Sequence, residues 1–329
     1  MKYDFVSFGD ITTDCFIKLK DARVHCNINN EDCELCVKFG QKIPFESATV
    51  IPAVGNGPNA AVAVARIGFS SAAACEMGDD ANGAECLQRL KDSGVHTELV
   101  GIHAGMPTNY HYVLMYEAER TILIKHQLYG RELPKFDEPP QWFYLTSLAE
   151  GTEEFQHAIA AYAKANSVRL CFQPGTFQIK MGKEKLADIY TATEIFFCNK
   201  EEAQMILNTQ EADVKKLMQG IHALGPKIVV VTDGPNGSNI LEQDGSAWHA
   251  PMYPDPAPPV SRTGAGDATA STTVAYLMKG LPPREALLRG LINAASVVQG
   301  IGAQTKLLTA DEIEAWYQKR PPQFQVVAL

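Results

Sequence analysis

The sequence predicts an α/β fold in which a mainly parallel sheet carries helices on both faces and a small β appendage lies beside it. From residue 142 onward, strand-like and helix-like segments alternate, which is typical of a parallel sheet. Two separate stretches, 15–55 and 106–126, instead contain short strand-forming runs joined by polar turns. Because neither stretch is long enough for an independent core, we expect both to lean on the main domain.

Each element follows from its local pattern of apolar residues and turn formers. The N-terminal half predicts a buried strand at 3–9, strand-like runs near 15–20, 34–39 and 47–53, an alanine-rich helix at 59–68, a strand at 70–75, a helix at 81–93 and a strand at 97–102. Residues 109–116 and 121–124 are rich in strand formers and flank a turn, so they predict a hairpin.

The C-terminal half predicts the alternating elements of the sheet. Its expected strands are 142–145, 168–172, 194–198 and 227–232, and its expected helices are 153–165, 180–188, 200–207 and 211–223. A hairpin region at 238–250 and a proline-rich segment precede three helices at 265–278, 284–299 and 311–319.

Composition and charge exclude several classes of protein. With 46% apolar and 20% charged residues among 329, the chain has the composition of a globular protein. A net charge of −9 argues against a nucleic-acid-binding protein, which needs a basic face. No apolar run is long enough to span a membrane, and the N-terminus lacks the pattern of a secretory signal. We therefore expect a cytoplasmic location.

The eight cysteines are expected to be reduced thiols in that compartment. Three of them end apolar runs and should pack inside, namely Cys75, Cys171 and Cys198. Four potential zinc ligands gather near the N-terminus: His25, Cys26, Cys33 and Cys36. Their spacing is short for a zinc module and contains one C-x-x-C pair instead of two, so we expect loop cysteines without a chemical role.

The strongest sign of chemistry is the segment 261–267, Ser-Arg-Thr-Gly-Ala-Gly-Asp, directly before a predicted helix. Small residues allow a tight turn, and a helix N-terminus offers unpaired N–H groups and a positive dipole end, which suit a phosphoryl group. A carboxylate at Asp267 would repel such an anion, and a role as general base would explain it. The pattern alone equally allows a simple glycine turn with Asp267 complementing the helix dipole.

Three further loops occupy places where α/β sheets bind ligands. The apolar run 229–232 leads into a glycine-rich loop at 233–237, the segment 55–59 precedes the alanine-rich helix, and Asn199 and Glu202 follow a strand. Each has a structural alternative, namely a common glycine turn, a helix start with proline in its first turn, and an asparagine N-cap followed by acidic residues.

Together and in this order, these features resemble the ribokinase, or PfkB, family of small-molecule kinases, over nearly the whole chain. The segment 263–267 matches the family's C-terminal signature, and 9–14 matches a first-strand pattern that ends in a substrate-binding aspartate. The remaining matches are the substrate motif with Gly55 and Asn59, the N-x-x-E pair Asn199 and Glu202, the nucleotide loop with Thr232, Gly234 and Gly237, the lid hairpin at 119–121, and the adenine-side helix at 293–295.

The resemblance implies a three-layer α/β/α sandwich with a β lid. The core would comprise 1–14, 56–105 and 127–329, and the lid 15–55 and 106–126. The implied reaction is phosphoryl transfer from ATP to an alcohol, with Asp267 as general base and the backbone N–H groups of Gly264, Ala265 and Gly266 around the transferred phosphate.

The resemblance also implies which residues bind the two substrates. Those for the acceptor would be Asp14, Gly55, Asn56, Asn59 and Asn109. Those for the nucleotide would be Asn199, Glu202, Thr232, Gly234, Gly237, Thr263 and Asn293. Glu202 would hold Mg²⁺ through water, because magnesium retains much of its hydration.

We expect the acceptor to be a sugar. The resemblance implies that members acting on sugar phosphates need an extra cation in the substrate pocket, and the stretch 55–64 contains no lysine or arginine, which argues against a sugar phosphate. A nucleoside is the alternative, because four aromatic side chains would serve either for stacking on a base or as lid core: Phe39, Phe45, Tyr110 and Tyr112. A non-catalytic binding protein is a third possibility, suggested by Val54 in place of a usual glycine and by Ser261 and Arg262 in place of a usual Asp-Thr. The retained Asp267 and its glycine cradle argue against it.

Other departures from the family pattern concern ions and assembly. Ser261 replaces an aspartate that helps to hold a monovalent cation, and Arg262 places a positive charge nearby unless it is solvated, so we expect little dependence on potassium. Gln173-Pro174-Gly175 stands where Asp-Pro-Asn is common. Lids of the family often pair between subunits and bury their strand edges, so the resemblance implies a homodimer.

Overall fold

A central sheet organises the protein, whose computed structural model describes residues 2–26, 33–117 and 119–329. Its nine strands are Phe5–Phe8 (β1), Ser71–Ala74 (β6), Trp142–Leu145 (β11), Arg169–Phe172 (β12), Thr193–Asn199 (β13), Ile228–Thr232 (β14), Ser238–Leu241 (β15), Ala247–Ala250 (β16) and Val327–Ala328 (β17). The order is β17-β16-β15-β14-β13-β12-β11-β1-β6. The strands from β6 to β14 run parallel, and β15, β16 and β17 are antiparallel. The predicted α/β class is confirmed.

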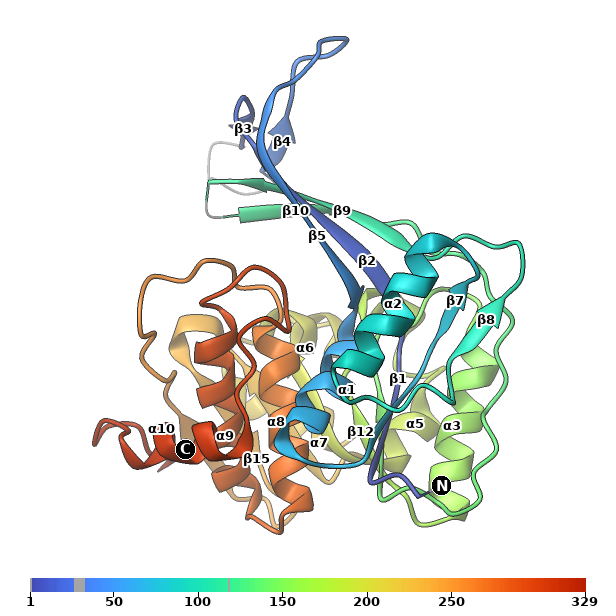
Figure 1. Ribbon diagram of the computed structural model, residues 1–329. Coiled ribbons are helices and arrows are strands. Elements are labelled where there is room, and N and C mark those ends of the chain that lie inside the picture. Colours follow the sequence, from blue (N-terminus) through green and yellow to red (C-terminus); the bar gives the residue numbers. More distant parts are fainter. Residues whose placement is uncertain (1, 27–32, 118) are drawn as a thin grey trace.

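Helices cover both faces of this sheet (Figure 1). One face carries Asn56–Ile67 (α1), Ala265–Met278 (α8), Pro283–Val297 (α9) and Ala310–Gln318 (α10). The other carries Glu153–Ala165 (α3), Ala187–Ala192 (α5), Lys200–Leu207 (α6) and Val214–His222 (α7). Successive strand residues alternate between the two cores, as Phe5 packs toward the first face and Val6 toward the second. The result is a sandwich of three layers.

A second sheet, the lid, stands above the carboxyl ends of the central strands (Figure 1). Its strands are Thr12–Leu19 (β2), Phe45–Val54 (β5), Tyr110–Tyr116 (β9) and Glu119–Leu123 (β10), in the order β10-β9-β2-β5. Strands β9 and β10 are antiparallel, so the predicted hairpin is confirmed. Strand β2 is longer than expected and begins at Thr12.

The two faces of the lid carry different residues. Cross-strand pairing puts Asp14, Ile51 and His111 in one row, and the adjacent row consists of Val50, Cys15, Tyr112 and Leu123. Because neighbouring rows point to opposite faces, Asp14 faces the core domain while Tyr112 faces away from it. In the outward row, Val50, Tyr112 and Leu123 remain 50%, 47% and 52% exposed.

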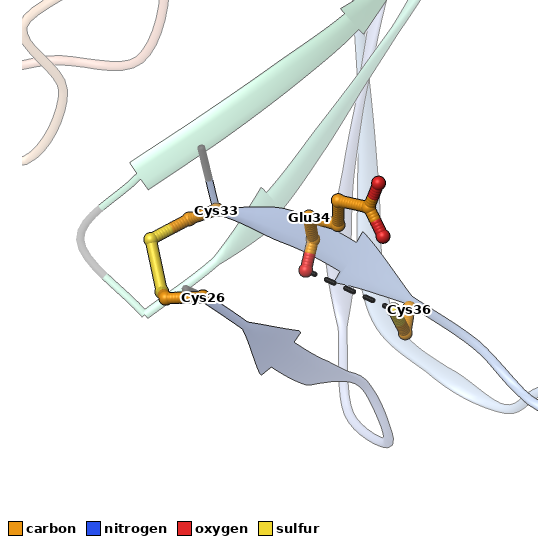
Figure 2. The surroundings of a disulfide bond; sticks show 4 residues. All are labelled: Cys26, Cys33, Glu34 and Cys36. Atoms are coloured by element: carbon orange, nitrogen blue, oxygen red, sulfur yellow. Dashed lines mark hydrogen bonds between the residues drawn. A yellow bond between two sulfur atoms is a disulfide. The ribbon is translucent and has the colours of Figure 1, made fainter. Parts of the chain in front are cut away.

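The hairpin of Arg23–His25 (β3) and Glu34–Cys36 (β4) extends from the lid and carries a disulfide between Cys26 and Cys33 (Figure 2). This corrects the expectation that these two cysteines are reduced. The pairing of β3 with β4 ends at His25 and Glu34, so the next residues outward stand opposite each other, with Cα atoms 4.1 Å apart. Within the described residues, no group of three or more His, Cys, Asp or Glu side chains could hold a metal ion.

Some predicted boundaries were wrong. The single helix expected at 180–188 is two short helices, Thr176–Met181 (α4) and Ala187–Ala192, because Gly182 turns the chain at φ 93° after the first. The strand expected at 97–102 is only Gly101–His103 (β8), paired with Glu76–Gly78 (β7). No helix in the described ranges is long and apolar enough to cross a membrane.

The remaining helix, Ala81–Asp92 (α2), is tied to the lid through Asp80. The Asp80 carboxylate accepts from the backbone N–H of Gly83, which caps the helix, at 2.9 Å. It also accepts from the hydroxyl of Thr108 at 2.6 Å and the N–H of Thr108 at 3.1 Å, just before β9. Burial raises the pKa of Asp80, but the hydrogen bonds from Thr108 and Gly83 outweigh it, and the pKa is lowered overall.

We predict that Asp80→Ala lowers the free energy of unfolding by about 1–2 kcal/mol, because a cap and a lid contact are lost together. Urea unfolding at pH 7 measures this effect, and Asp80→Asn, which keeps an acceptor at the cap, should lose less. Since the folded-state pKa is lowered, the stabilisation from ionised Asp80 is present at neutral pH and disappears as the pH falls through that pKa. Equal stability of Asp80→Ala and the wild type at pH 7 would contradict the assignment.

Candidate active site

A cavity of about 470 Å³ lies between the inward face of the lid and the carboxyl ends of the central strands. Eleven of the predicted site residues line it: Asp14, Gly55, Asn56, Asn59, Asn199, Glu202, Thr232, Thr263, Gly264, Gly266 and Asp267. A second cavity of about 240 Å³ adjoins it and shares Thr232, Arg262 and Gly266 with it. The second cavity is also lined by the predicted residues Gly234, Gly237 and Ala265.

The N-terminus of α8 lies where the two cavities meet, because Gly264 and Gly266 line the larger cavity and Ala265 and Gly266 line the second. The preceding Gly264 has φ 86°, and a Cβ there would lie 2.4 Å from the Cβ of Ala303, so only glycine fits. At Gly266 the nearest atom to an added Cβ is Nε2 of Gln173, 3.8 Å away, which leaves the backbone open to a ligand. An anion at this turn would meet both the N–H groups and the helix dipole.

Asp267 lies in this first turn. Its carboxylate is buried and accepts hydrogen bonds from three side-chain amides. Nδ2 of Asn56 and Nδ2 of Asn59 each lie 2.8 Å from one of its carboxylate oxygens, and Nε2 of Gln173 lies at 3.4 Å. Burial raises the pKa of Asp267, and the three amide hydrogen bonds act in the opposite direction. The carboxylate is thus a buried acceptor directed into the cavity. The sequence motifs predicted that Asn56 and Asn59 bind the acceptor substrate, and they did not predict these hydrogen bonds to Asp267.

The segment that leads into α1 is bent into position at Ala53. This residue has φ 59°, an unusual conformation for a non-glycine residue, at an irregularity in the pairing of β5 with β2. Sγ of Cys86 accepts its N–H at 3.1 Å, and Nε2 of Gln304 donates to its carbonyl at 2.7 Å. Gly55 follows with φ 115°, and a Cβ there would lie 2.3 Å from the carbonyl oxygen of Asp10.

Two carboxylates and two imidazoles stand at the lid end of the cavity. Nδ1 of His111 lies 3.5 Å from Asp14, and Nδ1 of His126 lies 3.1 Å from Asp10. Asp10 also accepts from the guanidinium of Arg131 and, at 2.8 Å, from the N–H of Ala149. Burial raises the pKa of Asp10, but His126, Arg131 and Ala149 together lower it.

Sequence reasoning missed Asp10, His111 and His126. Asp10 had one usable signal, since it is a charged residue directly after the first buried strand. The two histidines carried none, because His111 reaches Asp14 only through the pairing of β9 with β2, and His126 meets Asp10 from a segment far along the chain. Within the described part of the chain, Nε2 of His111 is buried without a hydrogen-bond partner. Oδ1 of Asp14 and Nδ1 of His126 have only the ion-pair contacts given above.

Asn199 and Glu202 form a reciprocal capping box at the start of α6. The Asn199 side chain accepts from the N–H of Glu202 at 2.7 Å, and Glu202 accepts from the N–H of Asn199 at 2.8 Å. The structural alternative therefore holds, yet both side chains also line the cavity. Burial raises the pKa of Glu202, and the Asn199 N–H partly offsets this.

Two predicted ligands line neither cavity, because their amides are used inside the fold. Asn109 donates to the carbonyl of Ile11 at 3.0 Å and accepts from the N–H of Gln127 at 2.8 Å. Asn293 donates to Thr272 at 2.8 Å and accepts from the N–H of Leu308 at 2.9 Å.

The four aromatic candidates for base stacking also lie outside the main cavity. Tyr110 and Tyr112 pair with each other, with ring centroids 5.2 Å apart, and Tyr112 belongs to the outward row of the lid. Phe39 is 101% exposed and Phe45 56% exposed. Ile122 and Ile124 supply apolar surface to the cavity instead.

The loop around Ser261 is held by side-chain contacts of its own. Oγ of Ser261 donates to the hydroxyl oxygen of Thr263 at 3.0 Å and accepts from the N–H of Thr263 at 3.2 Å. Arg262 is exposed to solvent and lines both cavities.

Gly237, which also lines the second cavity, has φ 88°, and a Cβ there would lie 2.3 Å from the carbonyl oxygen of Ala250.

Sequence comparison relates this chain to named kinases. The family model described as pfkB family carbohydrate kinase matches residues 25–310. A cytidine kinase of Thermococcus kodakarensis is 35% identical over 142 residues, which cover 42% of this chain and 49% of that protein. The chain thus aligns with about half of that relative. A ribokinase of Mus musculus is 26% identical over 261 residues, covering 76% of this chain and 80% of the relative.

Solved structures share the fold. The nucleoside kinase of Methanocaldococcus jannaschii, described as an archaeal member of the ribokinase family, superposes with a TM-score of 0.79 at 20% identity, over 97% of this chain and 99% of that one. The ribokinase of Arabidopsis thaliana, complexed with ribose and ATP, also has a TM-score of 0.79, at 19% identity, over 96% and 98% of the two chains. The fold is therefore that of ribokinase. With the family model matching most of its length, the chain belongs to the PfkB family of carbohydrate kinases, which are phosphotransferases with an alcohol acceptor.

Proposed function

We propose that this protein transfers the γ-phosphoryl group of ATP to a hydroxyl group of a free sugar, with Asp267 as general base. The observation that carries the proposal is the position of Asp267, a buried carboxylate in the first turn of α8. It lines the larger cavity and directly follows Gly266, a residue that lines both cavities. A carboxylate beside an anion site has little structural benefit, and a base there has a task.

In the proposed reaction, the acceptor hydroxyl lies against Asp267 and the γ-phosphate lies against the N–H groups of residues 264–266. As the acceptor oxygen forms its new bond to phosphorus, its proton passes to the Asp267 carboxylate. The bond from phosphorus to the bridging oxygen of ADP breaks in the same step. The helix N-terminus stabilises the charge on the phosphoryl oxygens, and Arg262 is near enough to add to it.

Magnesium would accompany the nucleotide. One oxygen of Glu202 is engaged in the capping box, while the side chain still lines the cavity, so a carboxylate oxygen remains for the waters of a hydrated ion. Burial raises the pKa of Glu202, and a cation held nearby would act in the opposite direction by stabilising the ionised carboxylate. The ion would neutralise phosphate charge when bound. Asn199 and Glu202 would hold it through water.

The chemistry of the lid end supports a sugar as the acceptor. Nε2 of His111 has no hydrogen-bond partner among the described residues, and the Asp14 carboxylate lines the same cavity. These groups suit a ligand with several hydroxyl groups, because each hydroxyl both donates and accepts. The aromatic residues expected to stack on a base lie outside this cavity.

A nucleoside is the second candidate acceptor, supported by the names of two relatives, a cytidine kinase and a nucleoside kinase. An assay of ATP consumption across a panel of sugars and nucleosides, with detection of the phosphorylated product, separates the two candidates. ATP bound without turnover on any acceptor would indicate a non-catalytic binding protein and would overturn the proposed function.

We predict that Asp267→Asn lowers kcat by about 10²- to 10⁴-fold while nucleotide binding stays nearly unchanged, because the variant loses the base and keeps the shape. Turnover on the best acceptor and ATP affinity by calorimetry measure the two effects. Asp244→Asn, in an exposed turn, is the matched control and should behave as the wild type. Wild-type turnover in Asp267→Asn would show that another group takes the proton.

Asp14→Ala should raise the KM for the acceptor by about 10- to 100-fold, as expected for a lost hydrogen bond to a charged group. The KM for ATP should change little, because Asp14 lies on the inward face of the lid. Steady-state kinetics with each substrate varied gives both values, and the exposed Asp21→Ala controls for the loss of a lid carboxylate. A loss of ATP affinity in Asp14→Ala would contradict its assignment to the acceptor.

We also propose a homodimer that forms through the outward row of the lid, because Val50, Tyr112 and Leu123 leave adjacent apolar side chains exposed on a small sheet. Light scattering at micromolar concentration should give twice the mass of the chain, and Tyr112→Lys should halve it. Ile102→Lys, at an exposed apolar residue outside the lid, serves as the control. A monomeric wild type would refute the dimer.

A further inference from the structure

Gln173 is the one amide around Asp267 that the family motifs do not supply. It directly follows β12, at the position where the family pattern commonly has aspartate. Its Nε2 lies 3.4 Å from Oδ1 of Asp267 and 3.8 Å from the place of a Cβ on Gly266. The amide thus lies beside both the carboxylate and the first turn of α8.

The orientation of this amide is set from beneath by Tyr144. The Tyr144 hydroxyl, buried in the core under the cavity, donates to Oε1 of Gln173. Burial raises the pKa of Tyr144 well above its usual value, so the hydroxyl stays protonated and remains a donor. With Oε1 occupied, the NH₂ end of Gln173 faces Asp267.

A second amide is oriented in the same way. Nε2 of Gln304 donates to Oδ1 of Asn59 at 3.0 Å, which turns Nδ2 of Asn59 toward Asp267 at 2.8 Å. An amide that is reversed would present its oxygen to the carboxylate and repel the charge. The outer contacts from Tyr144 and Gln304 therefore decide whether these groups stabilise or destabilise ionised Asp267.

We propose that Gln173, oriented by Tyr144, is a positioning residue that keeps the Asp267 carboxylate ionised and directed at the acceptor. The inference rests on the proposed function, in which Asp267 takes the acceptor proton. Aspartate at position 173 would bring a second negative charge against Asp267, and the glutamine donates a hydrogen bond without adding charge. The other two side chains bonded to Asp267, Asn56 and Asn59, are neutral. The charged residues Arg262 and Glu202 line the same cavity. The residue at position 173 therefore decides whether a charged group stands in direct contact with Asp267.

The test compares Gln173→Leu, Gln173→Glu and Tyr144→Phe with the wild type by measuring kcat against pH on the best acceptor. Since the base must be ionised, activity falls as the pH drops through its pKa, and loss of a donor should move this acidic limb to higher pH. We expect a shift of about 0.5–1 pH unit in Gln173→Leu and Tyr144→Phe, and a larger one in Gln173→Glu. The KM for ATP should stay within about twofold of the wild type in Gln173→Leu and Tyr144→Phe, which add no charge beside the phosphate turn.

Tyr190→Phe is the matched control, because Tyr190 is a buried tyrosine in the core on the other face of the sheet. This variant should have the same acidic limb in its profile of kcat against pH as the wild type. Tyr144→Phe removes one hydroxyl and Gln173→Glu exchanges one group of similar size, so both remain informative if Gln173→Leu does not fold. An unshifted acidic limb in these two variants of an active enzyme would overturn the inference and leave the proposed function standing. A wild type without kinase activity on the whole panel would overturn both.

Discussion

The burial of one negative charge is the constraint on which the site depends. Asp267 has little contact with water, so neighbouring dipoles must replace its hydration if it is to remain ionised. They come from the first turn of α8, from two asparagines of α1 and from Gln173 after β12. These groups are far apart in the chain. Only the stacking of α1 against α8, and the placement of both beside the end of β12, brings them to a single carboxylate.

The lid borders the same cavity from the opposite side, and the residues of its strands alternate between its two faces. Its inward row brings Asp14 and His111 to the cavity, while the outward row carries apolar residues. Asp10 secures the junction, because it accepts from Arg131 and from the backbone of Ala149 in the core domain. The lid end of the cavity and the core domain are therefore physically linked through neighbouring carboxylates.

Much of this arrangement was predictable, because it depends on local patterns. Alternating elements indicated the parallel sheet, and glycines next to a helix start indicated the turn at Gly264, whose positive φ requires glycine. Residues such as Asp10 and Arg131 meet across 121 positions, and no local pattern encodes that contact. Asn109 and Asn293 matched in position, but internal hydrogen bonds occupy both amides. The Cys26–Cys33 bond depends on the register of β3 with β4, which the spacing of the cysteines did not reveal.

The strict alternation of β2 limits how this lid is able to diverge. Asp14 faces the cavity and the adjacent Cys15 belongs to the outward row, so inserting or deleting one residue before them would exchange the two faces. A carboxylate would then lie among exposed apolar side chains, and the cavity would receive a thiol. Changes in the length of β2 are tolerable only in steps of two residues, or with a compensating bulge such as the irregularity at Ala53 in β5. Relatives with other acceptors are thus expected to differ in the identity of lid residues more than in the length of this strand.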